Sequence, residues 1–223
     1  RIHVSGTRID SVQQNFYTSY QLKPVDVFQW TYPLENDQLF AGESNYLRWD
    51  SSISGTNGTV SVSYDNGATW NEISTVDLNK GFLRWEAADT FTKVMVKMSS
   101  DGREFTSASF SLSKPLRLKV GYNCTEGILL TWPRNLSASS YNFYVLKNNS
   151  LQILKNTIDT AIEVTRSEIE SEFFAVSPVH ASGIEGLRSL TINAATQGVG
   201  CYFQSLLADI GQEKNIILNL KLG

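Results

Sequence analysis

The sequence predicts an all-β chain, folded as two tandem antiparallel β-sandwiches with the first strands of a third unit after them. Apolar and polar residues alternate with period two, and Gly, Asn, Asp and Ser interrupt the alternation about every eight to twelve residues. No apolar stripe with helical spacing competes with this pattern. The alternation also stops at a proline and then begins again, which predicts two separate sandwiches.

Residues 1–27 come before the regular alternation. Residues 2–4 and 9–12 could form strands, but no feature of the sequence fixes their partners. We interpret 1–27 as a lead-in, a linker or the tail of an upstream domain.

Residues 28–113 are expected to form the first sandwich. Each strand has one apolar row that faces the core and one polar row that faces solvent. The serines at 107, 109 and 111 belong to a polar row. The predicted apolar rows are Leu47 with Trp49, Val60 with Val62 and Tyr64, Leu83 with Trp85, Val94 with Val96 and Met98, and Ala108 with Phe110 and Leu112.

Residues 114–195 are expected to form the second sandwich, since Ser113-Lys114-Pro115 ends one pattern and starts the next. Residues 196–223 open a third unit, in which 216–222 reads as a strand, and we interpret the chain as a fragment of a longer protein. The predicted rows of the second sandwich are Leu116 with Leu118, Val120 and Tyr122, Ile128 with Leu130 and Trp132, Tyr141 with Phe143 and Val145, Ile162 with Val164, Phe174 with Val176, and Leu190 with Ile192.

The second unit resembles a fibronectin type III domain. The resemblance rests on Pro115, on Trp132 at the end of Gly-Ile-Leu-Leu-Thr-Trp, on the alternation at 141–145 and on the stretch 173–189, which is similar to the family's sixth strand, turn and final strand. The family's corner tyrosine is missing, and Glu172 stands near its place. The resemblance implies seven strands, of which the first and the last run toward the same pole.

Cys124 and Cys201 are the only cysteines, and their spacing of 77 residues matches no zinc or redox motif. In the topology implied by the resemblance, Cys124 follows the first strand and Cys201 the last, so both belong near one pole. We expect a disulfide there, and the alternative is two reduced, partly buried thiols.

The first unit resembles the immunoglobulin-like module of Ser/Thr-rich GPI-anchored proteins and of many bacterial secreted proteins. The matching stretches are Ala41-Gly42, 47–49, 60–70, 82–85 and 109–112. The tail at 198–209 is similar to the start of a repeat in large secreted proteins of Bacteroidota type. Such modules commonly follow a catalytic domain, such as a subtilisin-like protease or a glycosidase.

Ser63, Asp65, Gly67 and Trp70 match the Asp-box pattern S-x-D-x-G-x-x-W, which sialidase propellers repeat in each blade. In this pattern the carboxylate accepts backbone N–H groups across a tight turn, Gly supplies a positive φ and Trp packs beneath. The motif occurs once in this chain, so we expect a structural hairpin turn that carries no catalysis.

The five tryptophans are candidates for a sugar-stacking surface. Trp49, Trp85 and Trp132 are in phase with apolar neighbours, and we expect them in the core. Trp30 and Tyr32, beside a proline in the lead-in to the first sandwich, are the candidates for an exposed ligand-binding pair.

The sequence contains no recognisable active site. His3 and His180 are the only imidazoles, and neither has the sequence context of a catalytic triad. G-x-S-x-G, H-E-x-x-H and metal-ligand spacings are absent. We therefore expect no catalytic residue, cofactor or metal in this fragment.

Composition points to the setting of the chain. The net charge is −3, so no dense basic surface for nucleic acid is expected. Ser, Thr and Asn make up 59 of 223 residues while charged residues are only 18%, which is typical of extracellular β modules. No apolar run reaches the roughly 18 residues of a membrane span.

The function that fits these observations is a non-catalytic pair of modules from a secreted or cell-surface multidomain protein. It would space, present or dock neighbouring domains of the same chain. One alternative is a carbohydrate- or surface-binding module whose partner is a polysaccharide or another surface protein. Another is the accessory C-terminal region of a secreted hydrolase.

Overall fold

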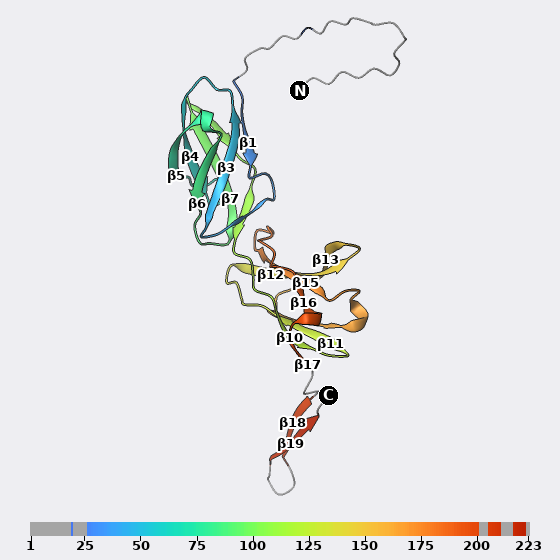
Figure 1. Ribbon diagram of the computed structural model, residues 1–223. Helices are drawn as coiled ribbons and strands as arrows, with labels where there is room; N and C mark the ends of the chain where they lie inside the picture. Colours follow the sequence, from blue (N-terminus) through green and yellow to red (C-terminus); the bar gives the residue numbers. More distant parts are fainter. Residues whose placement is uncertain (1–18, 20–25, 201–204, 211–215, 222–223) are drawn as a thin grey trace, which may run out of the picture.

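The computed structural model describes residues 19, 26–200, 205–210 and 216–221. The strands expected at 2–4 and 9–12 lie outside the described residues. Within the described part, the regular elements are β-strands and three single 3-10 turns, η1 (Leu78–Lys80), η2 (Arg166–Glu168) and η3 (Ala194–Thr196). The prediction of an all-β chain is confirmed (Figure 1).

The first sandwich packs the sheet β1-β3-β6 against a larger sheet in the order β2-β9-β7-β4-β5, in which β8 also pairs with β7. β2 and β9 run parallel, and the other pairings in this sandwich are antiparallel. The strands are β1 (Phe28–Tyr32), β2 (Gln38–Phe40), β3 (Ser44–Ser51), β4 (Asn57–Ser63), β5 (Asn71–Asp77), β6 (Phe82–Glu86), β7 (Thr92–Ser100), β8 (Arg103–Thr106) and β9 (Phe110–Ser113).

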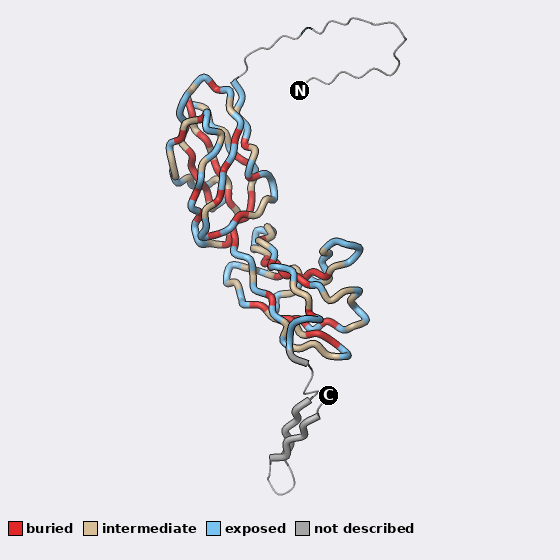
Figure 2. The backbone as a smooth tube through the Cα atoms, viewed as in Figure 1, coloured by how far each residue is buried: buried red, intermediate tan, exposed pale blue. Residues whose placement is uncertain are grey.

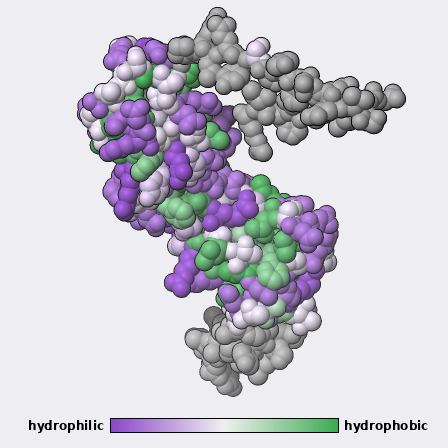
Figure 3. All heavy atoms as spheres, turned by 45° about the horizontal axis from the view of Figure 1, so that its top comes forward, coloured by the Kyte–Doolittle hydropathy of each residue, from purple (hydrophilic) through white to green (hydrophobic). Residues whose placement is uncertain are grey.

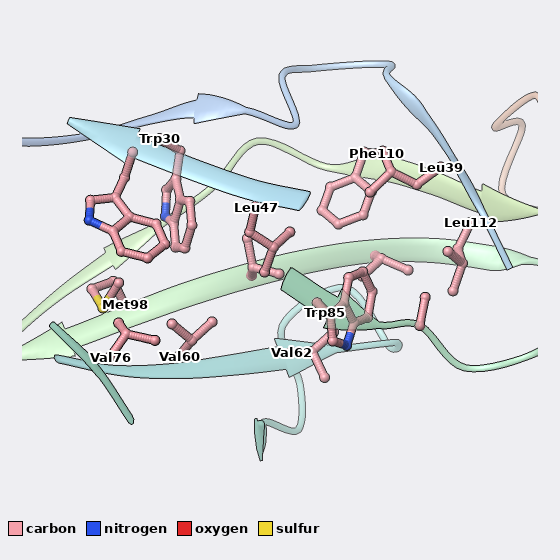
Figure 4. Packing of buried hydrophobic residues seen from close by; sticks show 14 of the residues in the cluster. Trp30, Leu39, Leu47, Val60, Val62, Val76, Trp85, Met98, Phe110 and Leu112 are labelled. Atoms are coloured by element: carbon pink, nitrogen blue, oxygen red, sulfur yellow. The ribbon is translucent and has the colours of Figure 1, made fainter. Parts of the chain in front are cut away.

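The core of the first sandwich lies between its two sheets, as expected from the alternation. In β3 every second residue is buried, so that Leu47 and Trp49 face inward, and in β7 Val94, Val96 and Met98 do the same. Figure 2 shows this alternation of buried and exposed backbone, and Figure 4 shows the side chains meeting between the sheets. Trp49 also donates its indole N–H to the carbonyl of Leu78 at 2.9 Å.

The serine row at 107–111 departs from the prediction, since Ser107 and Ser111 are buried. The segment before β2 covers this row, because the Asn36 N–H donates to the Ser109 carbonyl and the Ser111 N–H donates to the Asp37 carbonyl. Ser107 is satisfied locally, because its hydroxyl accepts from the Val96 N–H at 3.0 Å. Alternation in one strand does not show that a distant loop covers its outer face.

The second sandwich packs the sheet β14-β11-β10-β17 against the sheet β13-β12-β15-β16. β10 and β17 pair in parallel, as expected for first and last strands that run toward one pole. The strands are β10 (Lys119–Asn123), β11 (Gly127–Thr131), β12 (Ala138–Lys147), β13 (Ser150–Thr157), β14 (Ala161–Thr165), β15 (Phe173–His180), β16 (Ile192–Asn193) and β17 (Val199–Gly200).

The buried residues of this sandwich form a core separate from the first one. Trp132, Phe143 and Phe174 stack through its centre, with ring centroids 6.1 and 5.5 Å apart along the series. The predicted row of Leu190 with Ile192 is wrong, because Leu190 is 86% exposed. The segment before β16 is irregular there: the Ser189 N–H donates to the Val176 carbonyl at 2.8 Å, and the Val176 N–H donates to the Ser189 hydroxyl at 3.0 Å.

Beyond the second sandwich, β18 (Ser205–Ile210) and β19 (Ile216–Lys221) pair as an antiparallel hairpin. The strand expected at 216–222 is therefore present over 216–221. Among the described residues, no helix is long and apolar enough to cross a membrane.

Candidate functional site

Trp30 and Tyr32, the pair expected to bind a ligand, face different ways. Trp30 is 7% exposed, so its expected exposure is wrong. It is paired with Trp49 across β1 and β3 and points into the core (Figure 4), where its indole N–H donates to the Phe105 carbonyl at 2.8 Å. Tyr32 lies past a bulge in β1 and remains 36% exposed.

Two aromatic residues missed by the sequence reasoning lie on the same outer face as Tyr32. Tyr46 of β3 and Phe82 of β6 are 45% and 49% exposed, and their ring centroids are 6.1 Å apart at a tilt of 56°. The strand register places them near Tyr32, because Arg48 of β3 is opposite Tyr32 of β1 on one side and opposite Phe82 of β6 on the other. The sequence contained a signal for these two residues. Tyr46 and Phe82 stand at positions where the alternation of their strands places outward-facing polar residues.

Charged residues alternate with these rings. The guanidinium of Arg48 lies over the Tyr46 ring at 5.7 Å and forms no ion pair with any described residue. Arg84 is opposite Tyr46, bonds the Ser44 hydroxyl through Nε at 2.5 Å and lies 3.6 Å from the Glu86 carboxylate. We call Tyr32, Tyr46, Arg48, Phe82 and Arg84 the aromatic face; Asp50 and Glu86 border it on β3 and β6.

The Asp-box residues form a tight hairpin turn between β4 and β5. The Asp65 carboxylate accepts the Thr69 hydroxyl at 2.6 Å, the Thr69 N–H at 2.8 Å and the Ser63 hydroxyl at 2.7 Å. These hydrogen bonds lower the pKa of Asp65 to about 2. Gly67 has a φ of +90°, and the Trp70 ring lies beneath the turn within van der Waals reach of a Cβ at that position. Both carboxylate oxygens accept hydrogen bonds from within the turn, which is a structural arrangement.

The two sandwiches lie end to end (Figure 1), and residues of the 185–187 loop contact the first sandwich. The Leu187 N–H donates to the Ser113 hydroxyl at 2.6 Å. The Gln38 side-chain amide donates to the Glu185 carbonyl at 3.4 Å. We call this set of contacts, with those of Phe91, His180 and Gly186 below, the junction.

Phe91 is the apolar centre of the junction. It is 6% exposed although it belongs to neither sandwich core, and it meets the His180 ring edge to face at 5.4 Å. Gly186 lies against it: a Cβ there would be 2.7 Å from Ser113 Oγ, 2.9 Å from Phe91 and 2.9 Å from Pro178. The first two neighbours belong to the first sandwich and the third to the second. Any side chain at 186 therefore forces the sandwiches apart or displaces the loop.

The loop of the junction is held from behind by a partly buried polar cluster. The Ser177 hydroxyl donates to the Glu185 carboxylate at 2.5 Å, and the Tyr144 hydroxyl donates to the same carboxylate oxygen. The guanidinium of Arg188 stacks 4.1 Å above the Tyr144 ring. Burial and the hydrogen bond to Glu185 raise the pKa of Tyr144, so it stays a neutral donor. These contacts within the second sandwich anchor the 185–187 loop.

At the opposite pole of the second sandwich, an ion pair occupies the corner where the fibronectin resemblance lacked its tyrosine. Arg166 of η2 pairs with Glu172, donates to the Asn123 side chain and donates through Nε to the Cys124 carbonyl at 3.1 Å. Asn123 in turn donates to the Ala194 carbonyl at 2.7 Å. The described parallel pairing of β10 and β17 ends at Asn123 and Gly200, one residue before each cysteine, while Cys201 lies outside the described residues.

His180 is the histidine that lies within the described residues, and its side chain contacts Ser182 and Phe91. His180 Nδ1 accepts the Ser182 N–H at 3.1 Å, a local turn contact, and His3 lies outside the described residues. Residues 26–200 contain no group of three or more His, Cys, Asp or Glu side chains placed to hold a metal ion.

Comparisons with known proteins give a likeness of fold only. No family model and no curated protein matches the chain. Among solved structures, a two-domain fibronectin type III segment of chicken tenascin is similar with a TM-score of 0.37 and 14% identity, covering 75% of this chain and 95% of that one. The fibronectin(III)-like modules of Clostridium thermocellum CbhA follow at 0.30 and 12%, covering 73% and 90%.

The FN1–FN3 domains of chicken CNTN1 give a TM-score of 0.28 and 13% identity. That match covers 70% of this chain, which spans 61% of the CNTN1 segment. These likenesses do not place the chain in a family.

Proposed function

We propose that this chain is a non-catalytic tandem β-sandwich region of a secreted or cell-surface multidomain protein, and that it holds neighbouring domains at a fixed separation and orientation. The observation that carries the proposal is the junction. Domains joined by a bare linker move relative to each other by default, so a spacer that sets orientation needs contacts beyond the linker.

The junction supplies such contacts with three kinds of interaction. Phe91 buries an aromatic ring between the sandwiches, the Ser113 hydroxyl accepts a backbone N–H from the other sandwich, and Gly186 permits close approach. The cluster around Glu185 orders the docking loop before contact, which reduces the entropy lost when the sandwiches dock. The connecting segment from Lys114 to β10 is short, so it adds little freedom of its own.

The setting is part of the proposal. The Ser-, Thr- and Asn-rich composition supports an extracellular location. The resemblances to immunoglobulin-like modules of GPI-anchored-protein type, to fibronectin type III domains and to Bacteroidota repeats support a surface multidomain parent. A secreted hydrolase as parent would use the same region as a spacer between its catalytic domain and another module.

Backbone amide ¹⁵N relaxation of the two sandwiches tests the proposal. A fixed junction makes residues 28–113 and 119–193 tumble with one common rotational diffusion tensor. Gly186→Asn is expected to separate the two sandwiches into independently tumbling bodies, because its Cβ overlaps atoms of both. Gly183→Asn is the matched control, since Gly183 has open space around it and a φ of +81° that Asn tolerates.

Two results would overturn the proposal. Independent tumbling in the unmodified chain would show that the junction does not hold. Common tumbling in both Gly186→Asn and Gly183→Asn would show that close packing at 186 does not hold the sandwiches together.

A further inference from the structure

The aromatic face has features that a spacer does not need. Tyr32, Tyr46 and Phe82 expose more than a third of their surface on neighbouring strands of one sheet. In the rest of this sheet the outward positions are polar, as in Gln29, Asp50 and Glu86. Clustered exposed rings on a soluble β-sheet lower solubility and are typical of binding surfaces.

The shape of the aromatic face favours an extended ligand. β1, β3 and β6 form an open sheet surface, and two strand spacings of about 4.8 Å each separate Tyr32 from Phe82. Two hollows of the described part contain no residue of the aromatic face: one of about 300 Å³ is lined by residues of β1, β8 and the segments that follow them, and the other lies on the second sandwich. An open sheet surface suits an extended chain that lies across it better than a small molecule that needs enclosure.

The charges of the aromatic face favour a neutral ligand. Arg48 and Arg84 contribute two positive charges, and Asp50 and Glu86 next to them contribute two negative charges. A polyanion would meet the two carboxylates, and a polycation would meet the two guanidinium groups. A neutral ligand that both donates and accepts hydrogen bonds can use all four groups.

We propose that the aromatic face binds a neutral polysaccharide or the neutral part of a glycan chain. A sugar ring has an apolar C–H face that stacks on an aromatic side chain, and a rim of hydroxyl groups that donate and accept. Tyr46 and Phe82 supply the stacking surfaces. Arg48, held over Tyr46, and Arg84, held by Ser44, supply oriented donors, while Asp50 and Glu86 supply acceptors.

Exposed apolar side chains on the second sandwich provide a contrast. On the side seen in Figure 3, hydrophobic residues also gather over the second sandwich. Its exposed apolar side chains include Ile153 and Leu190, at 55% and 86% exposed, which are aliphatic and offer no ring for stacking. They therefore serve as control positions for general surface hydrophobicity.

Affinity gel electrophoresis tests the inference with the full chain. Native gels contain galactomannan, mixed-linkage β-glucan, arabinoxylan or dextran as neutral probes, and alginate or heparin as anionic probes. We expect retardation in at least one neutral gel. Tyr46→Ala and Phe82→Ala should each weaken binding about tenfold, the upper end of what one aromatic contact contributes.

Conservative and distant variants separate stacking from other effects. Tyr46→Phe keeps the ring and should keep most of the affinity, while Ile153→Ala on the second sandwich should change nothing. Because Tyr46 and Phe82 are about half exposed, their alanine variants are expected to fold, which circular dichroism and thermal unfolding of each variant will show.

Three results would overturn the inference. The first is no retardation in any neutral gel. The second is retardation only in alginate or heparin that disappears with added salt, which would identify an electrostatic site for polyanions. The third is concentration-dependent dimerisation in sedimentation experiments that Phe82→Ala abolishes, which would make the aromatic face an interface between two copies. None of these results bears on the tumbling of the two sandwiches.

Discussion

Replacing Trp30 by alanine tests whether β1 is an integral strand of the first sandwich. The Trp30 indole is 7% exposed, meets the rings of Phe28 and Trp49 at 5.3 and 5.9 Å, and donates to the Phe105 carbonyl at 2.8 Å. Deleting a buried aromatic side chain costs about 3–5 kcal/mol. Losing a hydrogen bond adds about 1 kcal/mol, so Trp30→Ala should lower the free energy of unfolding by about 4–6 kcal/mol.

Two further variants divide this effect into its parts. Trp30→Phe keeps a ring but removes the N–H donor from the Phe105 carbonyl, and should cost about 1–3 kcal/mol. Tyr32→Phe, on the outward side of the same strand, should stay within about 0.5 kcal/mol of the unmodified chain. Guanidinium denaturation monitored by circular dichroism measures all three changes from the midpoint and slope of the first-sandwich transition.

A change in the free energy of unfolding of less than about 1 kcal/mol in Trp30→Ala would refute the burial of this indole, because it is too little for a buried aromatic side chain. Such a result would return Trp30 to the surface, where it was expected from the sequence. It would also restore Trp30 and Tyr32 as one ligand-binding pair.

Two other predictions concern the Asp-box turn and the cysteines. Because hydrogen bonds from Thr69 and Ser63 hold the pKa of Asp65 at about 2, below its unfolded value of about 4, Asp65 stabilises the fold above about pH 4, and this contribution is lost as the pH falls toward about 2. An NMR titration of the Asp65 carboxyl carbon checks this, and a midpoint of about 4 would contradict it. Cys124 and Cys201 are expected to form a disulfide in oxidising conditions worth about 2–4 kcal/mol, so reduction and Cys124→Ser should destabilise the second sandwich alike. Peptide mapping without reductant that recovers both cysteines alkylated would refute the bridge.

Alternation in the sequence predicted the two cores because the side-chain period of a strand is a local property. Leu47, Trp49 and Trp85 face inward because their neighbours in sequence are polar and face outward. The same rule placed Trp132 in the core of the second sandwich. Whether such a residue is buried depends on the alternation within its own strand, so a single stretch of sequence is enough to predict it.

Burial that depends on distant segments could not be predicted in this way. Trp30 is covered through a contact with Phe105, 75 residues later, and Phe91 is covered by the other sandwich. Gly186 lies in a loop without periodicity, and only the docked neighbours show why a glycine stands there. The residues of the aromatic face were recognisable as outward-pointing, but their grouping depends on the register of β1, β3 and β6.

The parallel pairs at the ends of each sandwich have a mechanical consequence. β2 pairs with β9 in the first sandwich and β10 pairs with β17 in the second, each pair joining an early strand to the last one. Tension applied before the early strand and after the last one slides the two past each other along their length. The hydrogen bonds of the pair then carry the load together in shear, and they are not peeled open one after another. The second sandwich thus opposes stretching at the place where the chain enters and leaves it. The chain enters the first sandwich through β1, which pairs with β3 in the other sheet, so there the parallel pair guards only the exit and the strand that follows β1.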